Sequence, residues 1–197
     1  MRKVVAFEFL SLDGVAEAPD TFVAGWDDVM DESGAALIAT QDAVILGRRS
    51  YDEWVAFWPD SDIEPFATFI NGVEKYVATS APLEREWAHT TVIDGDLVRF
   101  VRDLKDGPGG DIGVHASISV TQALLAAGVV DELRLAIAPV IVGRGEGSSM
   151  GCRRSVWKRS EASPHPPAIS WSTTGPSRSS PARLLPGGWP SGRRRRS

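Results

Sequence analysis

The sequence changes character near Glu146, and this change decides which part of the chain can build a hydrophobic core. Up to Glu146 the chain holds 25 acidic and 11 basic side chains, a balance of −14. Beyond it the chain holds one acid, Glu161, and 10 bases, a balance of +9, which completes the net charge of −5. This second stretch also contains 12 Ser and 7 Pro and no periodic apolar run. We therefore expect one domain over residues 1–146 and an irregular, basic, disordered tail over residues 147–197.

The composition of the two parts limits the partners that the protein can have. The acidic balance of residues 1–146 argues against nucleic acid, because phosphate binding needs a basic face. The run Arg193–Arg196 would suit nucleic acid or an anionic membrane, although a solvated tail is the simpler explanation. The apolar run Val4–Leu12 is broken by Glu8 and is too short for a signal peptide or a spanning helix. Cys152 is the only cysteine, so we expect a cytoplasmic protein without an internal disulfide. From the acidic balance and the short apolar run, we expect no nucleic-acid partner and no membrane partner.

Short apolar segments alternate with segments of helical periodicity throughout the first part. The segment Ala43–Leu46 is wholly apolar, as buried strands covered on both faces are. Gly128 marks the C-terminal stop of a helix. The alternation predicts an α/β fold with a largely parallel sheet and helices on both faces. We expect strands over residues 4–10, 43–46, 75–79, 90–93, 111–114 and 133–142, and helices over residues 27–40, 50–57, 97–105 and 117–127.

Three of these strands end in small or polar residues just before a helix or a loop. In an open α/β sheet, ligands lie beyond the carboxyl ends of the strands, where helix N-termini offer free N–H groups. Gly47 would let the backbone approach a phosphate, and Arg48 and Arg49 would pair with it bidentately. Ser80 would add a hydroxyl donor. Together the three ends favour a phosphorylated nucleotide, although each alone has the form of an ordinary turn and helix cap. The chain has neither a P-loop nor a Gly-x-Gly-x-x-Gly fingerprint. The residues are Gly47, Arg48, Arg49, Ser50, Thr79, Ser80, Gly113, Val114, His115, Ala116 and Ser117.

Two carboxylates, Asp13 and Asp31, are candidates for donating a proton to a substrate. The alternative for Asp13 is a turn former, and for Asp31 a favourable acid in the first turn of a helix. His115 lies at a strand end and could contact a ligand, and a hydrogen-bonded structural histidine explains it equally well. His89, His115 and His165 do not have the spacing of metal ligands, so we expect no metal site.

Aromatic residues gather between residues 26 and 58. Trp26, Trp54, Phe57 and Trp58 would line an apolar pocket for a flat heterocycle. Core packing is the alternative, because aromatic residues at this spacing commonly pack in the interior.

Three segments resemble the bacterial dihydrofolate reductase-like superfamily in order and spacing. They are Phe9–Val15, Val44–Tyr51 and Leu124–Leu135. The nearer resemblance is to the branch that contains the reductase domain of riboflavin biosynthesis. The resemblance implies a dihydrofolate-reductase-like mixed, mostly parallel sheet, NADPH as the hydride donor and assembly as a homodimer.

The resemblance also implies roles for the three strand ends. Gly47–Ser50 would meet the 2′-phosphate side of NADPH, Thr79–Ser80 would lie in the adenosine region, and Gly113–Ser117 would hold the pyrophosphate. Many members have a Gly-Gly pair where this chain has Ala116 and Ser117. A positive φ at Ala116 would therefore weaken the cofactor site, because Ala116 adds a methyl group where the backbone should approach a phosphate closely.

On this resemblance we predict an NADPH-dependent reductase that transfers hydride to a small heterocyclic or carbonyl substrate. A gapless count places Asp31 where true dihydrofolate reductases carry a carboxylate, but related members do not dependably keep an acid there, so folate is not implied. One alternative is the riboflavin-pathway 5-amino-6-(5-phosphoribosylamino)uracil reductase. The other is an inactive or non-catalytic small-molecule-binding product.

The tail departs from the family in a way that a shifted reading frame explains. Members usually continue Gly-x-Gly-x-Arg-Leu-Phe-Asp-Gly after the long strand and end near Asp-Tyr-Arg, whereas here the match stops at Glu146. Codons exist for Gly147–Gly151 and for Ile169–Pro176 with which a frame one base earlier restores both patterns. We hypothesise that a one-base frameshift near Glu146 replaced the C-terminal strands. The alternative is a genuine lineage-specific tail.

Overall fold

The computed structural model describes residues 1–23, 27–145 and 147. Six strands form one sheet in the order β4-β3-β2-β5-β1-β6, and all of its neighbouring pairs are parallel. The predicted α/β fold is therefore confirmed. The predictions for Trp26 and for the tail beyond Gly147 lie outside the described residues. The strands are β1 (Val4–Ser11), β2 (Gln41–Gly47), β3 (Glu74–Ala78), β4 (Thr90–Val92), β5 (Asp111–His115) and β6 (Glu132–Ala138).

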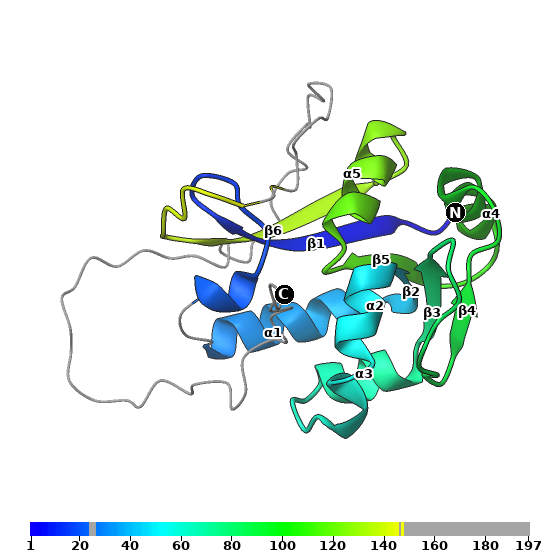
Figure 1. Cartoon of the computed structure of the whole chain (residues 1–197), viewed down its shortest axis with the longest axis horizontal. Helices are drawn as coiled ribbons and strands as arrows, with labels where there is room; N and C mark the ends of the chain where they lie inside the picture. The colour runs from blue at the N-terminus through cyan, green and yellow to red at the C-terminus, as the bar shows by residue number, and fades with distance from the viewer. Residues whose placement is uncertain (24–26, 146, 148–197) are drawn as a thin grey trace, which may run out of the picture.

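Helices cover both faces of the sheet, as the alternation predicts. One side carries α1 (Asp28–Ile38), α2 (Arg48–Trp54) and α3 (Phe66–Gly72), and the other carries α4 (Leu97–Asp106) and α5 (Ile118–Ala126) (Figure 1). The loops also contain the short 3-10 helices η1 (Pro19–Thr21) and η2 (Trp58–Asp60). Within the described residues, no helix is both long and apolar enough to cross a membrane.

Local sequence signals fix where several helices begin and end. Asp27 caps α1 by accepting a hydrogen bond from the N–H of Met30 at 2.9 Å, and Asp96 caps α4 by accepting from Arg99 N–H at 2.7 Å. α5 stops before Gly128, whose φ of 65° is a left-handed conformation that glycine adopts at little cost. The predicted stop at Gly128 is therefore confirmed.

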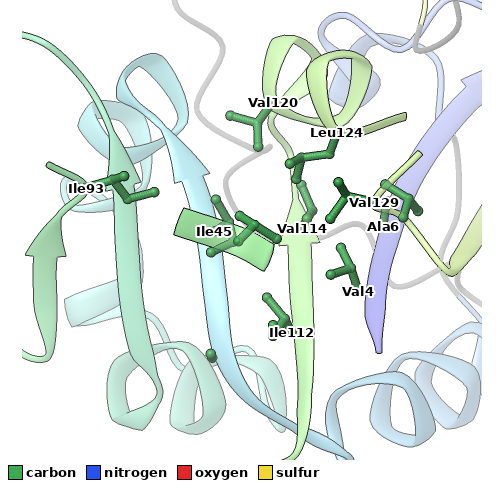
Figure 2. Close-up of a cluster of buried hydrophobic side chains, with 12 residues drawn as sticks. Val4, Ala6, Ile45, Ile93, Ile112, Val114, Val120, Leu124 and Val129 are labelled. Carbon is green, nitrogen blue, oxygen red and sulfur yellow. The ribbon is translucent and has the colours of Figure 1, made fainter. Parts of the chain in front are cut away.

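β2 sends side chains into two separate cores, because successive residues of a strand face opposite sides of the sheet. Ile45 packs with Val114 of β5 and Leu124 of α5 (Figure 2). Val44 packs on the other side with residues of α2 and α3. The residues of Ala43–Leu46 are all at most 2% exposed, so the prediction of a strand covered on both faces is confirmed.

The largest differences from the sequence-based expectation concern α2, β6 and α3. The helix predicted over residues 50–57 is α2, which begins at Arg48 and ends at Trp54. The strand predicted over residues 133–142 ends at Ala138, because Pro139 has no N–H for a ladder hydrogen bond. The helix α3, which has only 7 residues, was not predicted from the sequence. In the described part of the chain, β6 is the outermost strand on its side of the sheet.

Candidate functional site

The three strand ends that the sequence singles out lie side by side, because β3, β2 and β5 are neighbours in the sheet. Hydrogen bonds also join them beyond the sheet. Arg48 Nη1 donates to the carbonyl oxygens of Ala81 and Pro82, at 3.3 and 2.6 Å, and so ties the start of α2 to the loop after β3. The hydroxyl groups of Ser50 and Ser117 join the start of α2 to the end of β5. One corner of the sheet therefore holds all three ends.

The join between β2 and β5 is a relay of three hydrogen bonds. Gly47 N–H donates to Ser117 Oγ at 2.9 Å, and Ser117 Oγ donates to Ser50 Oγ at 2.9 Å. Ser50 Oγ then donates to the carbonyl oxygen of Ala116 at 2.6 Å. Ser50 is 6% exposed and Ser117 is 3% exposed. Both hydroxyl groups are therefore engaged inside the protein.

The two arginines that follow Gly47 have different surroundings. Arg48 Nε donates to both carboxylate oxygens of Asp52, at 2.9 and 2.7 Å, in addition to its two loop carbonyls. The side chain of Arg49 is 59% exposed, and it pairs with Glu53 at 3.2 Å and with Glu17 at 3.5 Å. Exposed ion pairs of this kind contribute little stability. Arg49 is therefore the arginine that can turn toward an anionic ligand.

Ala116 has a φ of 50°, the left-handed conformation for which the sequence predicts a weaker cofactor site. For a residue with a Cβ this conformation costs about 1–2 kcal/mol. Ala116 lies just before α5, whose first N–H groups, from Ile118 onward, have no partner within the helix. The side chain of Ser117 does not cap them. These N–H groups and the guanidinium of Arg49 are donors at this corner that an anion can reach.

Other predicted cofactor residues lie at the same corner with local roles. The hydroxyl of Thr79 accepts from the N–H of Ala81 and donates to its carbonyl oxygen, both at 3.1 Å, and so closes a turn after β3. Ser80 is exposed in that turn. Val114 is fully buried in the core, so its side chain has no surface to offer a ligand.

His115 is a buried histidine hydrogen-bonded to Gln41. Its Nε2 lies 2.8 Å from Gln41 Oε1, and the residue is 3% exposed. Gly113 makes room for this pair, since a Cβ there would clash with Gln41 Oε1 and would lie 2.7 Å from His115 Nε2. Burial lowers the pKa of His115 to about 4, so the ring is neutral at pH 7. The structural alternative for His115 thus fits the geometry, and Gly113 has a packing reason to be glycine.

The carboxylate of Asp13 links the loop after β1 to the loop after β6. It accepts from Ser11 Oγ at 2.6 Å and from the N–H groups of Val142 and Gly143 at 3.1 and 2.7 Å. The hydrogen bond from Ser11 and those from the two backbone groups lower the pKa of Asp13 to about 2. Asp13 is therefore ionised at neutral pH and has no proton to donate. Asp31 lies exposed in the first turn of α1.

Trp54 packs in the aromatic core and not at a surface. It is 2% exposed, and its ring meets those of Trp58 and Phe66 edge-on, with centroids 5.8 and 5.6 Å apart. Phe57 is half-buried, with its ring 5.0 Å from that of Trp58. Trp58 is also 2% exposed, so the core alternative describes both Trp54 and Trp58. The prediction for Trp26 falls outside the described residues.

His115 is surrounded by an aromatic group that was not predicted from the sequence. Phe7 and Phe9 of β1 are half-buried, with ring centroids 4.9 Å apart. Phe66 and Phe69 of α3 lie 5.7 and 6.4 Å from the imidazole of His115. The alternation of Phe7 and Phe9 along a strand, which sends both to one face, was the signal that could have found them.

Glu8 faces the opposite side of β1 from these rings and contacts α5. It is 4% exposed and accepts a hydrogen bond from Thr121 Oγ1 at 2.8 Å. Burial raises the pKa of Glu8 to about 7, although the bond from Thr121 acts in the other direction. In the sequence, Glu8 stands out only as a break in an apolar run. Over residues 1–23, 27–145 and 147, no group of three or more His, Cys, Asp or Glu side chains is placed to hold a metal ion.

Most of the sequence matches one family model and one bacterial protein. The sequence model of the RibD C-terminal domain matches residues 2–153. The uncharacterized protein YyaP of Bacillus subtilis (strain 168) is 29% identical over 150 residues, which cover 74% of this chain and 79% of that protein.

Solved structures show the fold that these residues adopt. A putative riboflavin biosynthesis protein from Shewanella sp. PV-4 superimposes with a TM-score of 0.61 and 19% identity, covering 78% of this chain and 86% of the other. A diaminohydroxyphosphoribosylaminopyrimidine deaminase/5-amino-6-(5-phosphoribosylamino)uracil reductase from Thermotoga maritima gives 0.55 and 15%, covering 79% of this chain and 50% of the other. Dihydrofolate reductase from Enterococcus faecalis, complexed with NADP(H) and RAB-propyl, gives 0.50 and 15%, covering 74% and 75%. The dihydrofolate-reductase-like fold is thus confirmed, and since the sequence match spans most of the chain, the protein belongs to the RibD C-terminal domain family.

Proposed function

We propose that the protein is an NADPH-dependent reductase that transfers hydride to a small heterocyclic or carbonyl substrate. The observation that carries the proposal is the joining of three strand ends at one corner, where an exposed arginine and an open helix N-terminus can meet anionic groups. Family membership supports it, since related structures include a uracil-derivative reductase and a dihydrofolate reductase complexed with NADP(H).

The groups at the corner fit the phosphates of NADPH. NADPH would supply the hydride, and the protein would bind and orient it. Arg49 would pair with the 2′-phosphate, and the first N–H groups of α5, from Ile118 onward, would bond the pyrophosphate. Arg48 would hold the loop at Ala81 and Pro82 against α2 and so shape the adenosine side.

Replacing Arg49 with alanine should weaken NADPH far more than NADH, because only NADPH carries the 2′-phosphate. A charge-assisted phosphate contact is worth about 1.5–3 kcal/mol, roughly one to two decades in affinity. Arg48→Ala should instead lower stability and weaken both cofactors together, since Arg48 is bonded to Asp52 and to two loop carbonyls. Fluorescence titration of each variant with both cofactors measures the difference.

A matched control is Arg99→Ala, which removes an exposed arginine from α4, on the other side of the sheet from α2. It should change neither affinity. If Arg49→Ala weakens NADPH and NADH equally, Arg49 does not bind the 2′-phosphate.

The riboflavin-pathway 5-amino-6-(5-phosphoribosylamino)uracil reductase is the second candidate, and the family match favours it. Its substrate carries a ribose phosphate, so NADPH oxidation with that compound, but not with its dephosphorylated form, would select it. If the folded chain fails to oxidise NADPH with every pterin and pyrimidine tested, the non-catalytic alternative is selected. If a chain in the restored reading frame is then active, the altered tail is the cause of the missing activity. Homodimer assembly and a cytoplasmic location stay predictions.

A further inference from the structure

The relay from Gly47 through Ser117 and Ser50 to Ala116 joins segments that are distant in the sequence. Its three hydrogen bonds span 70, 67 and 66 residues. It links the first turn of α2, where Arg49 lies next to Ser50, with the residue that precedes α5. The two sets of anion-binding groups at the corner are therefore connected by this relay.

The direction of the relay is fixed, because both of its ends are backbone groups. The N–H of Gly47 can only donate, and the carbonyl oxygen of Ala116 can only accept. Ser117 and Ser50 must therefore each donate their single hydroxyl hydrogen along the relay. Neither hydroxyl has a hydrogen left for a phosphate, and both residues are at least nine-tenths buried. Their chemistry suits holding the backbone better than binding a ligand.

The relay also holds a backbone conformation that the chain would not otherwise favour. Ala116 has a φ of 50°, and its carbonyl oxygen accepts the 2.6 Å hydrogen bond from Ser50. Because α5 begins two residues later, at Ile118, the conformation of Ala116 sets the direction in which α5 leaves β5. Without the relay, the left-handed turn at Ala116 would lose the hydrogen bond from Ser50 that holds its carbonyl group.

We propose that Ser50 and Ser117 are positioning residues for the cofactor site. They hold the first N–H groups of α5 at a fixed place relative to Arg49, so that one NADPH molecule can meet both. A site that is ordered in advance loses less entropy when the ligand binds. This inference rests on the proposed function, and it goes beyond it by assigning the two serines to site geometry and not to ligand contact.

The test is a set of binding titrations with NADPH, followed by tryptophan fluorescence. Ser117→Ala and Ser50→Ala should each weaken NADPH about tenfold, the effect expected for one buried hydrogen bond. The double variant should be no weaker than the weaker single variant, because a relay fails as a unit when either hydroxyl is removed. A purely structural loss at two separate positions would instead be additive.

The matched control is Thr121→Val, which removes a different buried hydroxyl bond in α5, the one to Glu8. It should lower the melting temperature as the serine variants do, yet leave NADPH affinity within about twofold of the wild type. If the serine variants bind NADPH as the wild type does, or if their losses add, the positioning role is overturned and the proposed function stands. If the folded wild type binds no NADPH, both are overturned.

Discussion

Replacing Trp54 with alanine is expected to lower the free energy of unfolding by about 3–5 kcal/mol, the range for deleting a large aromatic side chain from a packed core. Trp54 is 2% exposed and meets Trp58 and Phe66 edge-on, so alanine would leave a cavity lined by these rings. Urea unfolding of the variant and the wild type measures the loss. Native domains have free energies of unfolding of about 5–15 kcal/mol, so the expected loss would exceed half of the total stability of a domain at the lower end of this range.

Two comparisons decide whether Trp54 belongs to the core or to a substrate pocket. Val29→Ala, at a position in α1 that is 51% exposed, should change stability by about 0.5 kcal/mol or less. If the Trp54→Ala variant is as stable as the Val29→Ala variant but binds ligand more weakly, Trp54 lines a substrate pocket and is not part of the core.

Replacing Glu8 with glutamine is expected to remove a large pH dependence of stability. Burial raises the pKa of Glu8 from 4.5 to about 7, so ionising this side chain costs about 3 kcal/mol more in the folded protein than in the unfolded chain. The folded state therefore binds the proton more tightly. The contribution of Glu8 to stability is fully present below pH 4.5 and is lost as the pH rises through about 7.

The measurement is urea unfolding of the wild type and Glu8→Gln between pH 4.5 and pH 8. The difference between the two should grow in favour of the variant as the pH rises, by about 3 kcal/mol over this range. His115 has the opposite effect. Burial lowers its pKa from 6.5 to about 4, so its contribution to the stability of the protein is lost as the pH falls below 6.5 and through about 4. Because His115 is common to both proteins, only the difference between them reports on Glu8.

Glu86→Gln is the control for Glu8, since Glu86 is exposed and its replacement should give a profile parallel to the wild type. Parallel profiles for Glu8→Gln as well would mean that Glu8 is equally ionised in the folded and unfolded states, and that its contact with Thr121 does not exclude water.

The sequence was sufficient for the parts of the fold that depend on local patterns. The apolar run Ala43–Leu46 predicted a doubly covered strand, and Gly128 predicted the end of α5, because burial and left-handed backbone leave direct marks on residue type. The short helix α3 left a weaker mark. Its apolar residues Phe66, Phe69 and Ile70 have helical spacing, but 7 residues give too few repeats to separate it from a loop.

The site was predictable as a place but not as a set of contacts. The parallel alternation of strands and helices was enough to bring Gly47, Thr79 and Ala116 to one corner. It could not show that Arg48 would donate hydrogen bonds to the loop after β3 while the side chain of Arg49 stayed exposed. It also could not show the serine relay, because hydrogen bonds between residues about seventy apart depend on side-chain geometry that no local pattern records.

Titration of the folded chain with NADPH and with NADH, followed by the fluorescence of its tryptophans, tests the central claim most directly. We expect saturable binding of NADPH, with NADH weaker by one to two decades because it lacks the 2′-phosphate that Arg49 would hold. Circular dichroism on the same sample establishes that the chain is folded. A folded chain that shows no saturable binding of either cofactor would contradict the proposal that this corner of the sheet is a reductase cofactor site.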